Sequence, residues 1–137
     1  STARMVDHLT WELAGRGIKV MPFNLTVTDL GHLAMSLVEA ATIIVASPTI
    51  LTGLHPLVAE AVFLVNALRP KALFAGFIGS YGWKSRALDQ LKAMLDSVRF
   101  ELLNPVQIKG DPQPEDLALL TRLADDIYQK HQAAGLI

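Results

Sequence analysis

The chain contains no cysteine and no basic stripe, and 18% of its 137 residues are charged. Without cysteine it can form no disulfide, thiolate zinc site or iron–sulfur cluster. A formal net charge of −1 argues against nucleic acid as the main partner. No apolar run is as long as a membrane span, and the first residues lack a signal-peptide pattern. We therefore expect no membrane partner and a cytoplasmic location.

Apolar residues are abundant instead, at 51% of the chain. That fraction is enough for a substantial core, so the chain is not of the disordered class. No repeat, linker or low-complexity segment divides the sequence. We therefore expect residues 1–137 to form a single domain.

Two stretches share one design. Residues 42–56 read TIIVASPTILTGLHP, and residues 76–83 read GFIGSYGW. In each, a short apolar run changes abruptly to Ser, Gly, Pro and aromatic residues. The apolar runs suit strands buried on both faces of a parallel sheet, and the change marks their carboxyl ends. Because ligands bind at the carboxyl ends of such strands, the two stretches indicate a small-molecule cleft.

Helical and strand patterns alternate along the rest of the chain. The expected helices are Ser1–Gly15, a short helix ending near Glu39, Pro56–Leu68, Lys84–Val98 and Pro114–His131. The expected strands are Lys19–Asn24, Thr42–Ala46, Ala72–Ile78, and a last strand made of Phe100–Leu102 and Val106–Ile108. This order predicts an α/β fold, a doubly wound parallel sheet with helices on both faces.

The helix over Pro56–Leu68 is apolar on almost all sides. Such a helix is usually buried twice, once against its own sheet and once against another helix, domain or subunit. We therefore expect its outer face to meet a second domain or a second copy of the chain.

At this point the chain resembles a known family. Ser47-Pro48-Thr49 with Gly53 and Pro56, followed by Gly79-Ser80-Tyr81-Gly82-Trp83, resembles the flavodoxin-like domain of the A-type flavoproteins, or flavodiiron proteins. The segment Asn24–Asp29 and the run Pro114-Glu115-Asp116 are similar as well. The resemblance covers nearly the whole chain.

The resemblance implies FMN as cofactor and electron transfer as the task. The chain would be a module of an oxidoreductase, passing electrons to a di-iron domain of the same or a partner chain in a homo-oligomer. The family's metal motifs are absent from this sequence, so we expect no metal site and no catalytic residue in it.

The candidate FMN-binding residues fall into three groups. Hydroxyls at a helix N-terminus suit a phosphate, successive backbone amides suit the polar edge of the flavin ring, and aromatic side chains suit its faces. The candidates are Ser1 and Thr2; Ser47, Pro48, Thr49, Ile50, Leu51, Thr52 and Gly53; and Gly79, Ser80, Tyr81, Gly82 and Trp83. The competing interpretations are a helix cap, an ordinary strand-to-helix loop and surface aromatics. The four histidines show no metal-ligand spacing, and we expect them at the surface.

A flavodoxin-like sheet has five strands in the order 2-1-3-4-5, and four are readable here. The absent strand is the first, which would lie between Lys19–Asn24 and Thr42–Ala46. We therefore expect a further strand and a phosphate loop before Ser1. In the chain itself we expect an empty position in the sheet, a strand from another chain, or a shifted second strand.

Two other functions compete with the electron-transfer module. A stand-alone flavin-dependent reductase, such as a quinone reductase, has the same fold, but no substrate or nicotinamide motif is visible. A phospho-acceptor receiver domain needs an Asp at the end of the strand Thr42–Ala46, where this chain has Ala46 and Ser47. The loops, rather than the fold, separate these functions.

Overall fold

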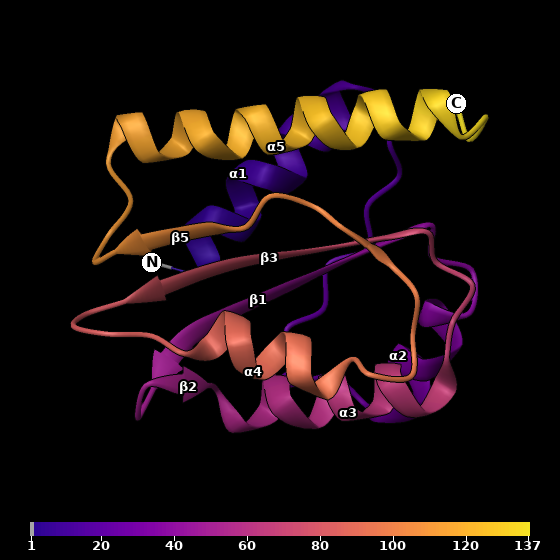
Figure 1. Ribbon diagram of the computed structural model, residues 1–137. Coiled ribbons are helices and arrows are strands. Elements are labelled where there is room, and N and C mark those ends of the chain that lie inside the picture. Colours follow the sequence, from indigo (N-terminus) through magenta and orange to yellow (C-terminus); the bar gives the residue numbers. More distant parts are fainter. Residues whose placement is uncertain (1) are drawn as a thin grey trace.

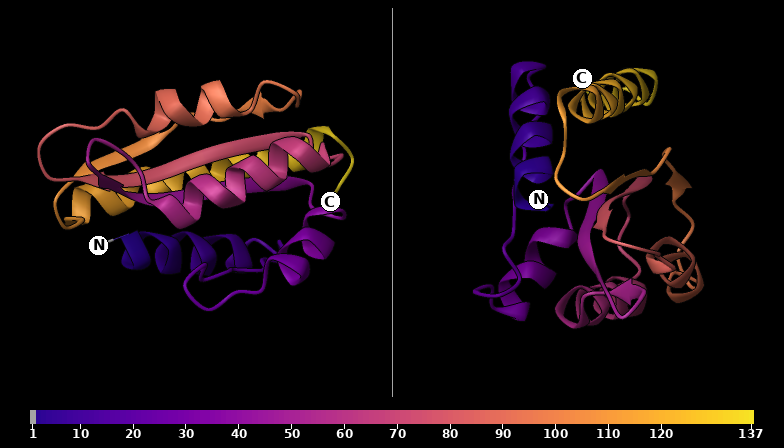
Figure 2. Two further views of the ribbon diagram at one scale, coloured as in Figure 1. Left: turned by 90° about the horizontal axis from the view of Figure 1, so that it is seen from below. Right: turned by 90° about the vertical axis from the view of Figure 1, so that its left-hand side faces the viewer.

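The computed structural model describes residues 2–137 as three layers, a sheet between two layers of helices (Figure 1). Helices α1 (Thr2–Gly15) and α5 (Pro114–Ala133) cover one face. Helices α3 (Pro56–Leu68) and α4 (Ala87–Met94) cover the other, and α2 (Leu30–Leu37) packs beside α3. The right-hand view of Figure 2 shows the same separation of the helices. The predicted α/β fold is confirmed.

The sheet is mostly parallel and is built around its two longest strands. β1 (Thr42–Ile50) and β3 (Phe74–Tyr81) pair in parallel from Thr42↔Phe74 to Pro48↔Ser80. The short strands β4 (Glu101–Leu102) and β5 (Val106–Lys109) follow one another along the far edge of β3. The predicted last strand, broken at Asn104-Pro105, is thus confirmed. The two-residue strand β2 (Gly53–Leu54), antiparallel to β1, was not expected from the sequence.

The predicted strand over Lys19–Asn24 is wrong. Residues 18–24 are neither helix nor strand and form no ladder with any described strand. Their apolar side chains still insert into the core, Val20 on the α1–α5 side and Phe23 on the α2–α3 side. A strand requires a pairing partner, and the described residues supply none at this position.

The same absence leaves one edge of β1 open. From Thr42 to Pro48 its described partner is β3 alone, with β2 meeting the other edge at Thr49 and Ile50. Along β3, Phe74–Ser80 are all buried, whereas Ile44, Val45 and Ala46 of β1 are half-exposed. The expected empty position therefore lies beside β1.

Helix α4 is shorter than the predicted Lys84–Val98. It begins at Ala87 and ends at Met94, and Leu95 leaves the helical conformation at φ −93°, ψ 47°. Leu95 and Phe100 still pack against the α2–α3 side of the core. The apolar residues beyond Met94 therefore pack from an irregular segment and not from a further turn of helix.

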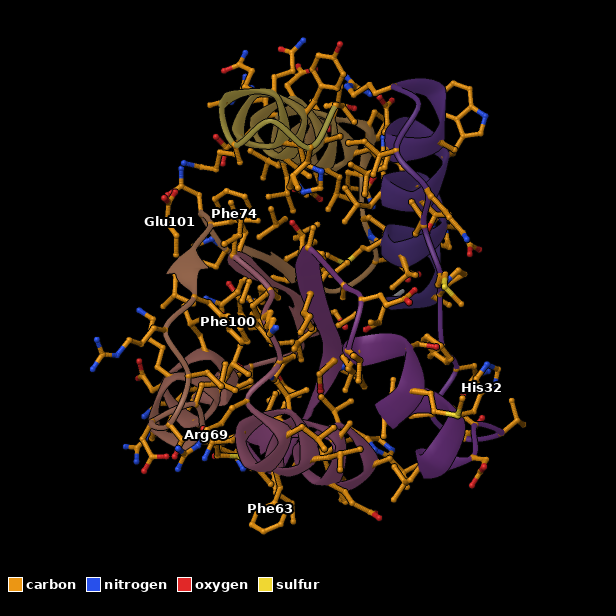
Figure 3. The ribbon with its side chains drawn as sticks, turned by 90° about the vertical axis from the view of Figure 1, so that its right-hand side faces the viewer. His32, Phe63, Arg69, Phe74, Phe100 and Glu101 are labelled. Atoms are coloured by element: carbon orange, nitrogen blue, oxygen red, sulfur yellow. The ribbon has the colours of Figure 1, made fainter. Side chains whose placement is uncertain are left out.

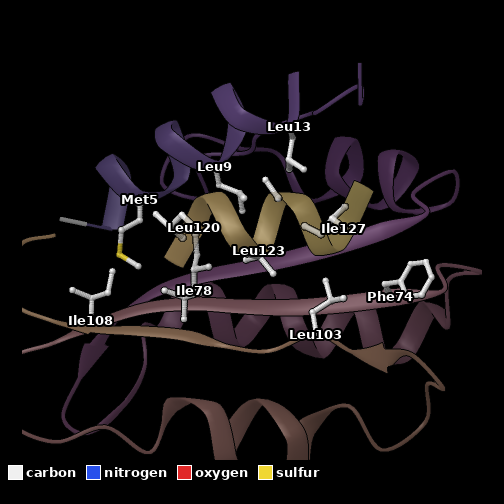
Figure 4. Close-up of a cluster of buried hydrophobic side chains, with 12 residues drawn as sticks. Met5, Leu9, Leu13, Phe74, Ile78, Leu103, Ile108, Leu120, Leu123 and Ile127 are labelled. Atoms are coloured by element: carbon white, nitrogen blue, oxygen red, sulfur yellow. The ribbon is translucent and has the colours of Figure 1, made fainter. Parts of the chain in front are cut away.

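The larger core lies between the sheet and the pair α1–α5 (Figure 4). Met5, Leu9 and Leu13 project from α1 at helical spacing and meet Leu120 and Leu123 of α5. Each buried side chain of this size contributes about 1.5–3 kcal/mol when removed from water. This packing fixes the direction of α1, and with it the position of its first turn.

A polar bridge supplements that packing. Arg16, which follows the last residue of α1, donates to Glu12 Oε2 and to Asp125 Oδ1 of α5, each at 2.6 Å. The guanidinium holds the pKa of Glu12 below its usual value through this hydrogen bond. The bridge joins the C-terminal end of α1 to the middle of α5.

His131 is buried, which corrects the expectation of a surface position. Its Nε2 shares a hydrogen bond of 2.6 Å with Thr42 Oγ1, and its ring stacks on Phe74 at 5.9 Å between centroids. Burial lowers the pKa of the imidazole, since the charged form loses its hydration. The neutral ring therefore closes the core between α5 and the start of the sheet.

The outer face of α3 is open to solvent within the described residues. Phe63 is 69% exposed and points away from the molecule (Figure 3). Leu57 and Leu68 are also exposed on the same helix. This agrees with the apolar pattern that predicts a second contact for α3; the contact itself stays a prediction.

The buried imidazole of His131 predicts a pH-dependent stability. Its pKa is lower in the folded chain than the unfolded value of about 6.5, so the unfolded chain binds more protons below that pH. The free energy of unfolding should fall as the pH drops from about 7 towards 5. His131→Gln keeps a hydrogen-bonding group for Thr42 and should flatten this dependence.

Urea unfolding at pH 7, 6 and 5 measures the effect, with His32→Gln as the control because His32 is exposed. Parallel pH profiles for the parent chain and His131→Gln would show that the imidazole is not the group responsible.

Candidate functional site

The candidate residues of the two loops lie together at the carboxyl ends of β1 and β3. The parallel register places Ser47 beside Gly79 and Pro48 beside Ser80. The first turn of α1 reaches the same edge of the sheet, at the left of Figure 1. The structure thus brings all three candidate groups to one end of the molecule, as the sequence predicts.

Ser47 lies within β1, which continues to Ile50 beyond the predicted strand end at Ala46. Its side chain is fully buried, its Oγ donates to the Pro48 carbonyl at 2.7 Å, and it accepts from the His55 amide at 2.9 Å. His55 in turn caps α3, because its Nδ1 accepts from the Leu57 amide at 3.1 Å. The role of Ser47 is therefore to hold the loop closed, and that of His55 is to start a helix.

The tip of the first loop is a strained hairpin turn. Ile50 pairs with Gly53, and the two residues between them have positive φ, 48° at Leu51 and 71° at Thr52. Two positive values at the central positions are typical of a type I′ turn, which favours Asn and Gly. Leucine and threonine pay a steric penalty there. The turn holds the Leu51 side chain 95% exposed.

Gly53 gives room to a side chain of α4. A Cβ at this position would lie 2.7 Å from Gln90 Oε1. That oxygen accepts from the Leu54 amide at 2.8 Å, so it ties the hairpin to α4.

Ser85 connects the two loops and was missed in the sequence. Thr49 Oγ1 donates to Ser85 Oγ at 2.8 Å, and the same oxygen accepts from the Ala87 amide at the start of α4, at 3.1 Å. A serine two residues before a helix is a capping signal that could have indicated it. Gln90 gave no such signal, because its partner is a backbone amide 36 positions away.

The second loop departs from the end of β3. A Cβ at Gly79 would lie 3.1 Å from the Ser47 carbonyl and closer still to the Phe77 ring. Glycine therefore allows β3 to approach β1 here. Tyr81 is half-buried and pairs with Lys109 of β5. Gly82 and Trp83 continue into solvent, and Trp83 is 91% exposed.

The start of α1 is joined directly to the second loop. Thr2 Oγ1 and Ser80 Oγ share a hydrogen bond of 2.8 Å across 78 positions of sequence. The first amides of α1 and the positive end of its dipole therefore face the carboxyl edge of the sheet. Ser1, the other candidate in this group, lies outside the described residues.

The assembled site has the character of a binding surface for a flat, anionic molecule. A helix N-terminus with a hydroxyl suits the anion, and two exposed apolar side chains, Leu51 and Trp83, rise from adjacent loops. Among residues 2–137 no group of three or more His, Asp or Glu side chains could hold a metal ion. No described helix is long and apolar enough to cross a membrane.

No protein-family profile matches the chain. Known proteins are nevertheless similar to it in sequence, and solved structures are similar to it in fold. It is 31% identical over 120 residues to a nitric oxide reductase of Moorella thermoacetica, covering 85% of this chain and 30% of that protein. The solved rubredoxin:oxygen oxidoreductase of Desulfovibrio gigas superposes with a TM-score of 0.87 and 26% identity, over 97% of this chain and 33% of that one. An archaeal flavodoxin superposes with a TM-score of 0.78 and 23% identity, over 96% and 90%.

The chain spans about a third of the length of these two oxidoreductases. A flavodiiron core from Synechocystis sp. PCC6803 superposes with a TM-score of 0.89 at 20% identity, which by itself shows the fold. The flavodoxin matches over almost its whole length, so the shared region is the flavodoxin-like part. The chain is therefore similar in sequence to part of a nitric oxide reductase and of rubredoxin:oxygen oxidoreductase, and its fold is flavodoxin-like.

Proposed function

We propose that this chain is an FMN-binding electron-transfer module of a flavodiiron-type oxidoreductase. The observation that carries the proposal is the strained turn at Leu51 and Thr52. It holds the Leu51 side chain in solvent, and Trp83 of the second loop is exposed as well; the two loops follow the carboxyl ends of two paired strands. Strain and exposed apolar area are both unfavourable in the free chain, and a bound ring would offset the exposure.

The described residues fit the parts of FMN. The amides and hydroxyl at the start of α1 would hold the phosphate, beside Ser80. Backbone groups from Pro48 to Gly53 would line the polar edge of the ring, and Leu51 and Trp83 would cover its faces. When bound, FMN supplies one- or two-electron transfer; the chain binds it, orients it and keeps water from it.

The electrons would pass to a di-iron centre in another domain of the same protein or of a partner subunit. The similarity to rubredoxin:oxygen oxidoreductase and to a flavodiiron core supports this. The exposed apolar face of α3, with Phe63 at its centre, is the surface that we propose for the domain or subunit contact. The cytoplasmic location expected from the sequence stays a prediction.

The open edge of β1 belongs to the same proposal. Thr2 lies at the carboxyl edge of the sheet, so a strand running parallel to β1 in the empty position would end where α1 begins. We propose that a strand of the same protein occupies it and that the loop after this strand completes the phosphate site. Right-handed connection of parallel strands through a helix is consistent with this path.

Replacing Trp83 tests the ring-binding role. Trp83→Ala should weaken FMN binding by about 1–3 kcal/mol, because a stacked indole loses both burial and ring contact. Titration of flavin fluorescence with each variant measures it. Trp11→Ala is the matched control, since Trp11 is 73% exposed on α1 away from the loops. Equal affinities for the parent chain, Trp83→Ala and Trp11→Ala would remove Trp83 from the site.

The hairpin strain makes a separate prediction. Thr52→Gly should raise the free energy of unfolding by about 1 kcal/mol without FMN, because glycine adopts φ near 71° without a steric penalty. Thr26→Gly, in a loop outside the positive-φ residues, should lower it. Chemical denaturation of the two variants measures the difference. If both substitutions destabilise equally, the turn stores no strain.

Amide hydrogen exchange tests the open edge. In residues 1–137 alone, alternate amides of β1 between Thr42 and Pro48 should exchange much faster than those of β3, because they face no strand. In the protein from its native source the same amides should be protected. Slow exchange along all of β1 in the isolated chain, or fast exchange in both proteins, would contradict the proposed strand.

A further inference from the structure

A cavity lies on the face of the sheet that α3 and α4 cover, opposite α1 and α5. Its volume is ≈ 370 Å³, and it is lined by β1, β3, α3, α4 and the segment around residues 98–105. Cores of this size are normally packed without voids larger than a water molecule. A space of several hundred cubic ångströms is instead in the range of small-molecule sites.

The sequence accounts for the space. Ala75, the second residue of β3, offers only a single methyl group to this space, and α4 ends at Met94, so irregular chain from Leu95 to Val98 forms part of the wall. The far edge of β3 is interrupted between β4 and β5, at Leu103–Pro105. The small side chain, the short helix and the interrupted edge strand all border the same space, which explains why it is not filled.

The lining is almost entirely apolar, with two polar side chains, Lys92 and Asn104. Val65, Leu91 and Phe100 are typical of the rest. Lys92 is exposed in the last turn of α4, and within residues 2–137 its ammonium group has no ion-pair partner. An apolar chamber with one unpaired cation at its wall is complementary to an apolar molecule that carries one negative charge.

We propose that this cavity binds a medium-chain monocarboxylate, with its alkyl chain between the sheet and α3–α4 and its carboxylate at Lys92. The cavity is separate from the candidate FMN site. Phe77 forms part of its wall, and the loop beyond Gly79 belongs to the flavin end of the same strand. Both ligands can therefore be bound at once, and the proposal stands independently of the flavin.

Calorimetric titration of the full chain with decanoate tests the proposal. Saturable binding at one site is expected, with decanol binding more weakly because it lacks the charge. Lys92→Gln should weaken decanoate binding by about 2- to 5-fold, in the range of an exposed ion pair, and leave decanol unchanged. Lys84→Gln is the control, an exposed lysine outside the cavity lining.

Ala75→Leu fills the cavity and should abolish binding of both compounds while keeping the far-ultraviolet spectrum. A second measurement does not depend on this variant folding. A spin-labelled fatty acid should broaden the methyl resonances of Val65 and Leu91 and spare those of Leu9 and Leu123 in the opposite core. Absence of saturable binding, binding that survives Ala75→Leu in a folded chain, or broadening in the wrong core would overturn the proposal.

Discussion

The parallel pairing of β1 with β3 is the constraint on which the rest of the structure depends. Its register joins Ser47 to Gly79 and Pro48 to Ser80, so two loops far apart in sequence leave the sheet side by side. Gly79 makes this approach possible, since a side chain there would meet the Ser47 carbonyl. The loops are then fixed by hydrogen bonds that do not depend on a ligand: the His55 amide donates to Ser47, and the Thr49 hydroxyl donates to Ser85.

The carboxyl edge of the sheet carries exposed apolar side chains and a strained turn, both of which are unfavourable for stability. Most apolar side chains of β3 are buried, yet Leu51 and Trp83 stand in solvent, and Leu51 and Thr52 adopt a turn that disfavours them. A chain optimised for stability alone would place Asn-Gly in that turn and polar residues at its tip. Residues that lower local stability in this way are expected mainly at functional sites, where binding is favoured over stability.

Features that depend on residues close together in the sequence were predictable, and those that depend on distant residues were not. Local patterns predicted the helix Pro56–Leu68 and the existence of two strands, because burial depends largely on adjacent residues. The strands end later than predicted, at Ile50 and Tyr81 rather than at Ala46 and Ile78, so the first residues of both predicted loops lie in strands. The strand Lys19–Asn24 failed, since pairing needs a neighbour that local pattern does not reveal. Helix α4 stopped early for a similar reason, as its last apolar residues pack without helical geometry.

In the site, the backbone positions were predictable and the supporting contacts were not. Ser85, Gln90 and the burial of His131 each depend on partners 36 or more positions away. The resemblance to flavodiiron proteins is the source of the proposed cofactor, FMN, and the geometry gives a reason why these loops would hold it. The open edge of β1 is relevant to the candidate site as well. A strand at that edge would lead into α1, whose first turn contacts Ser80.

The most direct test of the account is a map of backbone amide chemical shifts during titration with FMN. The account predicts changes confined to the first turn of α1, residues 47–53 and residues 79–83, together with Ser85, which bridges the two loops. It predicts no change in the core between α1 and α5. A set of shifts centred elsewhere, or none at saturating FMN in a folded protein that includes the proposed strand, would contradict it.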